Sequence, residues 1–116
     1  MDEIEGLGET TFREQRRAFG IRPKDRRHHV YIIGKTGTGK STLLKNMVIQ
    51  DLRYNHGVAL IDPHGDLVED LLNYIPRNRT NEVVYFNPAD KENPVGINIL
   101  EARGEDEKHL VASSLI

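Results

Sequence analysis

Apolar residues along this chain gather in short consecutive runs, which are separated by stretches with helical spacing. The runs cover residues 30–34 (VYIIG), 58–62 (VALID) and 82–88 (EVVYFNP). Consecutive apolar positions of this length, rich in β-branched and aromatic residues, are typical of strands buried on both faces. We therefore expect three strands, each in the interior of a sheet.

Helical spacing fills the gap between the first two runs. From about residue 40 to 54, apolar positions recur at intervals of three and four, with one polar exception at Asp51. The sequence NHG then ends the pattern, and Gly57 suits a left-handed C-cap. A shorter amphipathic stretch at residues 105–116 predicts the beginning of a further helix.

A second helix is expected from about residue 66 to 75. Asp66 is a candidate N-cap, Glu69 completes a capping-box spacing and Pro76 ends the helix. The chain thus alternates strand, helix, strand, helix and strand, which indicates a parallel sheet with right-handed crossovers. We predict an α/β fold with flanking helices and about three strands.

The first 27 residues show no sustained periodicity, and we interpret them as a charged extension or linker ahead of a domain that starts at residue 28. Residues 11–29 hold seven Lys or Arg against two acids. A solvated linker is the ordinary interpretation of such a charge run. Contact with nucleic acid through the stretch around Arg13–Arg27 stays open as the alternative.

Composition narrows the class of protein. The chain has 116 residues, of which 37% are hydrophobic and 29% charged, as expected of one small globular domain. No run approaches the roughly 18 apolar residues of a membrane span, and the acidic N-terminus does not resemble a signal peptide. Cysteine is absent, which excludes disulfides and thiolate metal sites. We expect a cytoplasmic protein, whose parent complex can lie at the inner face of the membrane.

The sequence GKTGTGKST at residues 34–42 matches G-x-x-x-x-G-K-[ST], the P-loop. Glycine at 34, 37 and 39 lets backbone N–H groups surround a phosphate without a Cβ in the way. Lys40 would reach the β- and γ-phosphates, and the Ser41 hydroxyl would complete a magnesium shell. The loop therefore predicts binding of a nucleotide with Mg²⁺.

Asp62 ends the second apolar run, as the aspartate of a Walker B strand does, and would then hold magnesium through water. The sequence DPHG at 62–65 also fits the D-x-x-G of GTPases. Asp62 follows Lys40 by only 22 positions, however, and no N-K-x-D motif occurs. A turn or capping role remains open for Asp62, and His64 is expected to be a surface residue.

Three segments together resemble the HerA–FtsK superfamily of DNA-pumping ATPases. They are RRHHVYIIGKTGTGKSTLLKNMVIQDL, GVALIDPHGDLVEDLL and VVYFNPADKENPVGINIL. Within that superfamily the chain is most similar to the type IV secretion and conjugative DNA-transfer ATPases of the coupling-protein kind. The resemblance spans about residues 10–116, and DPHGD directly after the P-loop helix is more specific than the P-loop itself.

The resemblance implies a RecA-like motor domain that acts as a ring, usually a hexamer, hydrolyses ATP with Mg²⁺ and pulls DNA through its centre. Asp62, Pro63 and Gly65 match the second-strand motif, while Arg27 and His28 match a basic position ahead of the loop. Lys40 and Asp62 become the catalytic candidates, and Ser41 and Asp62 the magnesium candidates. The nucleotide-binding positions are Gly34, Thr36, Gly37, Thr38, Gly39, Lys40, Ser41 and Thr42.

The sequence departs from the family pattern, because it holds no later acidic Walker B strand, no polar sensor and no arginine finger. We therefore expect an N-terminal piece of a longer ATPase that is inactive alone. Two other functions stay open: a nucleotide-binding module without turnover, and a P-loop nucleotide or small-molecule kinase. A kinase would need lid arginines, for which Arg77 and Arg79 are the downstream pair. The choice between ATP and GTP also stays open.

Overall fold

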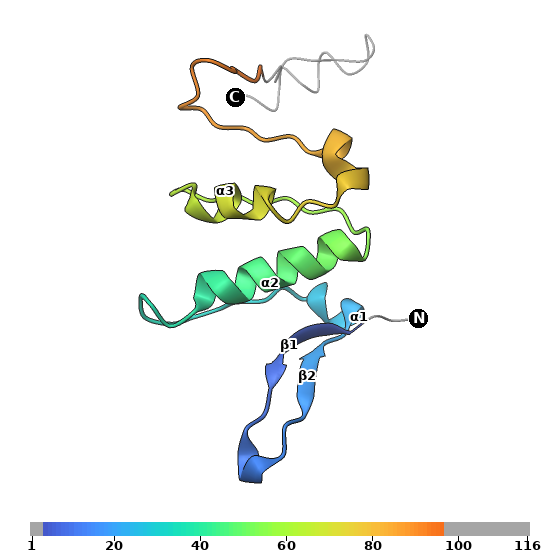
Figure 1. Cartoon of the computed structure of the whole chain (residues 1–116). Coiled ribbons are helices and arrows are strands. Elements are labelled where there is room, and N and C mark those ends of the chain that lie inside the picture. The colour runs from blue at the N-terminus through green and yellow to red at the C-terminus, as the bar shows by residue number, and fades with distance from the viewer. Residues whose placement is uncertain (1–3, 97–116) are drawn as a thin grey trace, which may run out of the picture. The chain divides into compact units, whose positions relative to one another are not determined.

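The computed structural model describes residues 4–96, and the chain divides after Glu82 into two units. The regular elements of the described residues all lie in the first unit (Figure 1). In chain order they are β1 (Glu5–Glu9), the 3₁₀ turn η1 (Phe12–Glu14), β2 (Ala18–Ile21), α1 (Pro23–Arg26), α2 (Lys40–Arg53), α3 (Asp66–Leu72) and the 3₁₀ turn η2 (Arg77–Glu82).

A β-hairpin occupies part of the segment that was predicted to be a linker. Strands β1 and β2 pair antiparallel, from Glu5 opposite Ile21 to Glu9 opposite Ala18, with an irregularity in the register between Gly6 and Gly8. Sequence analysis missed this hairpin because its strands, EGLGE and AFGI, are short, glycine-rich and without a clear alternation. Their formation depends on contacts with a distant helix.

That helix is α2, whose C-terminal half holds the base of the hairpin. The Gln50 side chain accepts from the Gly6 N–H through Oε1 at 2.8 Å and donates through Nε2 to the Gly6 carbonyl oxygen at 2.9 Å. Arg26 donates to both carboxylate oxygens of Asp51, each at 2.7 Å, and its Nε lies 2.7 Å from Glu5 Oε2. Glu5 and Asp51 are both buried, so one arginine compensates two carboxylates at this junction.

Helix α2 confirms the first predicted helix to within a residue at its C-terminus. Its end forms a Schellman motif: the His56 N–H donates to the Asp51 carbonyl oxygen at 2.9 Å and the Asn55 N–H to that of Leu52 at 3.4 Å. Asn55, with φ of 64°, takes the left-handed position. The prediction that Gly57 would occupy it was wrong, because the left-handed residue comes two positions earlier. Asparagine tolerates this conformation.

The three predicted parallel strands do not form in the described part of the chain. Residues 30–34 and 58–62 have no regular secondary structure, Glu82 belongs to η2, and the sheet of the described residues is the antiparallel hairpin alone. Ile33, Ile61 and Val84 are 80%, 93% and 81% exposed. Apolar runs state which residues favour burial, but a ladder also needs a neighbouring strand, and none of these segments meets one here.

The buried apolar residues of the described chain are few and lie on the two helices. They are Met47 and Ile49 of α2 and Leu71 of α3. Helix α3 ends at Leu72, three residues before the predicted end, where Tyr74 N–H donates to the Leu71 carbonyl oxygen and closes a tight turn. The predicted helix at 105–116 lies outside the described residues.

None of the helices within residues 4–96 has the length and apolar character that crossing a bilayer requires.

Candidate functional site

The glycine loop delivers the chain to the N-terminus of α2 in a left-handed conformation. Gly37 and Gly39 have φ of 79° and 92°, a region that residues with a Cβ adopt only under strain. Gly39 is the N-cap of α2, and its carbonyl oxygen accepts from the Leu43 N–H at 2.9 Å. Lys40 is therefore the first helical residue, and the unpaired N–H groups of the first turn surround the loop.

The start of the loop is closely packed. A Cβ placed on Gly34 would lie 2.5 Å from Thr38 Oγ1 and 3.4 Å from Lys40 Cγ, so glycine is required there for space. Thr38 folds back onto Lys35, whose carbonyl oxygen accepts from Thr38 Oγ1 at 2.6 Å and from the Thr38 N–H at 3.3 Å. These contacts close the loop into a compact turn.

The Lys40 ammonium lies inside this turn. Nζ donates to the carbonyl oxygens of Gly34 at 2.7 Å and Lys35 at 2.9 Å. Among the described residues it forms no ion pair. A full positive charge bonded only to neutral oxygens, beside a helix N-terminus, is a strong attractor for a phosphate.

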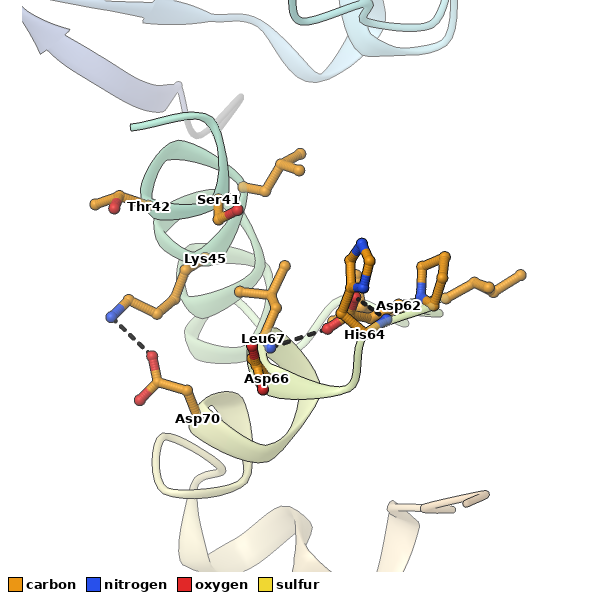
Figure 2. Close-up of a pocket in the computed structure, with 12 residues that line it drawn as sticks. Ser41, Thr42, Lys45, Asp62, His64, Asp66, Leu67 and Asp70 are labelled. Atoms are coloured by element: carbon orange, nitrogen blue, oxygen red, sulfur yellow. Dashed lines mark hydrogen bonds and ion pairs between the residues drawn. The ribbon is translucent and has the colours of Figure 1, made fainter. Parts of the chain in front are cut away.

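A cavity of about 500 Å³ lies beside the loop, between the start of α2 and the segment that leads into α3 (Figure 2). Ser41, Thr42 and Asp62, all predicted from the sequence as site residues, line it together. Gly34, Thr36 and Lys40 are not among its lining residues, so the loop lies next to the cavity rather than around it. The other lining residues are Leu44, Lys45, Leu60, Ile61, Pro63, His64, Asp66, Leu67 and Asp70.

The Asp62 carboxylate caps α3. Its Oδ1 accepts from the His64 N–H at 3.1 Å and its Oδ2 from the Leu67 N–H at 2.9 Å (Figure 2). These N–H groups, His64 first among them, hold the pKa of Asp62 below its usual value. Asp62 therefore stays ionised at neutral pH at the edge of the cavity.

The predicted capping box of Asp66 and Glu69 was wrong. Gly65, with φ of 88°, is the N-cap of α3, and Asp66 is already the first helical residue, with no side-chain cap bond from the N-cap position. The left-handed glycine turns the chain so that the carboxylate four positions before the helix start, on Asp62, reaches the free N–H groups. Capping at this longer range has no simple sequence signature.

Comparison of the sequence with protein families identifies the family of this chain. Residues 6–114 match the family described as helicase HerA, central domain. The chain belongs to the HerA central-domain family. The match supports the resemblance to the HerA–FtsK superfamily, a group of ATPase and helicase-like motors. No curated protein matched the chain, and neither did any solved structure.

HerA-family ATPases typically use ATP and Mg²⁺, and the residues of the loop fit both. The left-handed glycines leave room for phosphate oxygens at the start of α2, and the Ser41 hydroxyl and ionised Asp62 share one cavity. Residues 4–96 contain no group of three or more His, Asp or Glu side chains that could hold a metal ion by themselves.

Sequence analysis missed one polar contact beside this cavity. Lys45 Nζ donates to Asp70 Oδ2 at 2.9 Å, a contact that joins α2 to α3 (Figure 2). The same Nζ lies 5.4 Å from the centre of the Tyr74 ring. The Asp70 hydrogen bond raises the pKa of Lys45. Lys45 and Asp70 are 25 positions apart, and no local pattern pairs them.

Proposed function

We propose that this chain binds ATP with Mg²⁺ at residues 34–42 and that its parent protein couples ATP hydrolysis to DNA translocation. The observation that carries the proposal is the loop geometry: Gly37 and Gly39 are left-handed, and Lys40 begins α2 with its ammonium held in the turn. Membership of the HerA central-domain family supports a motor function.

In this proposal the loop N–H groups, from Gly34 to Thr42, surround the β- and γ-phosphates. The Lys40 ammonium leaves the carbonyl oxygens of Gly34 and Lys35 and bonds the phosphate oxygens, an exchange of neutral partners for charged ones. Ser41 would hold Mg²⁺ through its hydroxyl, and Asp62, which lines the same cavity, would hold it through water. When bound, the ion would supply positive charge beside the phosphates.

The more specific proposal is a type IV secretion or conjugative DNA-transfer motor. Its support is the order of segments in the sequence, with DPHGD directly after α2 and NPADKENPVGIN after the third apolar run. The parent would act as a ring, and the nucleotide site of this chain would be completed there.

A kinase is the weaker alternative, because the structure engages one of its two candidate lid arginines elsewhere. Arg79 donates through Nη1 to the carbonyl oxygens of His56 at 2.9 Å and Leu52 at 3.3 Å, at the C-terminal end of α2, and its Nε pairs with Glu82 at 2.9 Å. The glycine loop lies at the other end of the same helix. Arg79 therefore stabilises the helix end and does not face a bound nucleotide.

The test is binding of a fluorescent ATP analogue to the 116-residue chain, with and without Mg²⁺. Lys40→Ala should abolish Mg²⁺-dependent binding, while Lys24→Ala, which removes an exposed lysine of α1, should leave it unchanged. Equal binding by both variants would overturn the assignment of the loop. In the parent protein, phosphate release stimulated by DNA supports the motor, whereas phosphoryl transfer to a nucleoside or nucleotide supports the kinase.

A further inference from the structure

The turn of the β1–β2 hairpin carries a concentration of positive charge. We call residues 10–17, which join the two strands, the hairpin tip. It contains Arg13, Arg16 and Arg17 against a single acid, Glu14, and all of its residues are exposed. In Figure 1 the tip lies at the end of the hairpin away from α2.

Of the three arginines that follow β2, two pair with carboxylates and Arg27 forms no ion pair with a described residue. Arg22 pairs with Asp25 at 2.8 Å, and Arg26 pairs with Asp51 and Glu5. The three arginines of the hairpin tip form no ion pair with any described residue. Arg22 and Arg26 are thus engaged by carboxylates of the chain, whereas the arginines of the hairpin tip are available to an external anion.

An exposed aromatic ring lies among these arginines. Phe12 is 72% exposed, and the Arg13 guanidinium carbon lies 5.0 Å from the centre of its ring. Most of this ring therefore faces solvent. Aromatic rings interleaved with arginines are the combination that binds single-stranded nucleic acid, because bases stack on the ring and guanidinium groups bind the backbone.

The base of the hairpin is fixed to the helix that begins with the glycine loop. Gln50 bonds both backbone groups of Gly6, and Asp51 holds Arg26 just after β2. The exposed tip is therefore presented by an anchored element rather than by a free terminus. A linker, which was the ordinary interpretation of this charge run, would need no such anchor.

We propose that the hairpin tip binds single-stranded nucleic acid, with Arg13, Arg16 and Arg17 on the phosphates and Phe12 stacked on a base. This deepens the proposed function, on which it rests, by naming a surface that holds the strand. The family match includes the residues of the tip but says nothing of their role.

The test is fluorescence anisotropy of a labelled oligothymidylate of twenty nucleotides with the 116-residue chain. The tip variant Arg13→Gln/Arg16→Gln/Arg17→Gln should weaken binding about tenfold or more at low salt and reduce the salt slope by about 2, because each phosphate contact on a single strand contributes about 0.7. The matched control, Arg53→Gln/Arg77→Gln/Lys91→Gln, removes three exposed cations elsewhere and should stay close to wild type. Phe12→Ala should weaken binding about fivefold or more, while Phe12→Tyr retains it.

Equal weakening by the tip variant and the control would overturn the proposal, because net charge alone would then explain binding. It is also overturned if the wild-type chain fails to bind the oligonucleotide, or binds phosphatidylglycerol vesicles through the tip instead. The ATP analogue is measured on the same samples. If the chain binds the ATP analogue but the tip variant binds DNA as well as wild type does, the hairpin inference alone is contradicted. If the wild-type chain binds neither the ATP analogue nor the oligonucleotide, the proposed function is contradicted as well.

Discussion

The Nζ of Lys40 lies 2.7 Å from the carbonyl oxygen of Gly34, so the two ends of the glycine loop are joined by the side chain that would bind phosphate. Under the proposed function, the backbone would already be folded into a compact turn before phosphate binds. The Lys40 ammonium would then exchange partners, while the glycines would keep their conformation.

Gly34→Ala tests this preorganisation. The added Cβ would meet Thr38 Oγ1 and the Lys40 side chain, which forces the turn open. We expect nucleotide affinity to fall by about tenfold or more, since misplacing one charged hydrogen bond costs about 1.5–3 kcal/mol. Gly57→Ala is the control, because a Cβ there meets nothing within 4 Å. Titration with a fluorescent ATP analogue measures both, and equal affinities would show that the turn tolerates the extra atom.

Asp62→Ala should shorten or loosen α3, since it removes the acceptor for the His64 and Leu67 N–H groups. Asp66→Ala should have a smaller effect, because Gly65 is the N-cap of α3 and Asp66 is its first helical residue. Thermal melts followed by circular dichroism compare the two. A larger loss for Asp66→Ala would contradict the cap assignment.

The same aspartate predicts a pH dependence. Its pKa is lower in the folded chain than its ordinary value of 3.8, so its ionised form stabilises the fold above that value. This contribution is lost as the pH falls through the lowered folded pKa. The difference in stability between wild type and Asp62→Ala should therefore be full at pH 6 and shrink toward pH 2, as measured by urea unfolding.

Arg26→Gln should destabilise the junction between the hairpin and α2. It leaves the buried carboxylates of Glu5 and Asp51 without their cation, and we expect a loss of about 2 kcal/mol in the free energy of unfolding. Arg22→Gln breaks a pair whose members are 57% and 46% exposed, and should cost less than about 1 kcal/mol. Urea unfolding measures both, and similar losses would mean that the buried cluster adds nothing.

Glu5→Gln should behave differently with pH. Burial raises the pKa of Glu5 above 4.5, despite the opposing charge of Arg26, so the folded chain retains this proton to a higher pH than the unfolded chain does. Ionisation of Glu5 therefore lowers the free energy of unfolding progressively as the pH rises above 4.5. The stability of Glu5→Gln relative to wild type should thus improve between pH 4 and pH 7. A difference that stays constant over this range would contradict the assignment.

Local patterns predicted α2, α3 and the glycine loop, because their determinants are close in sequence, but they missed α1, which lies in the expected linker. Left-handed Gly39 and the periodic apolar positions after it are sufficient to start α2 at Lys40, and its end was placed within one residue. The glycine pattern likewise located Ser41, which the structure brings to the same cavity as Asp62. Whether these residues bind nucleotide stays a prediction.

Features that depend on distant partners could not be predicted in the same way. Gly6 and Gln50 are 44 positions apart, and their two hydrogen bonds help hold a hairpin whose strands lack a recognisable pattern. Conversely, Ile33 and Ile61 lie in runs with strong strand character but meet no neighbouring strand among the described residues. Burial preference is local information, whereas strand pairing is not.

The contacts of Gln50 and Asp51 with the base of the hairpin have a mechanical consequence. Helix α2 has 14 residues and so is about 21 Å long, with the glycine loop at one end and the hairpin base near the other. A rod fixed in this way acts as a lever: a few degrees of tilt about the loop become an ångström-scale displacement of the strand base. A tilt of α2 about the glycine loop would therefore move the base of the hairpin directly, because Gln50 and Asp51 join the two.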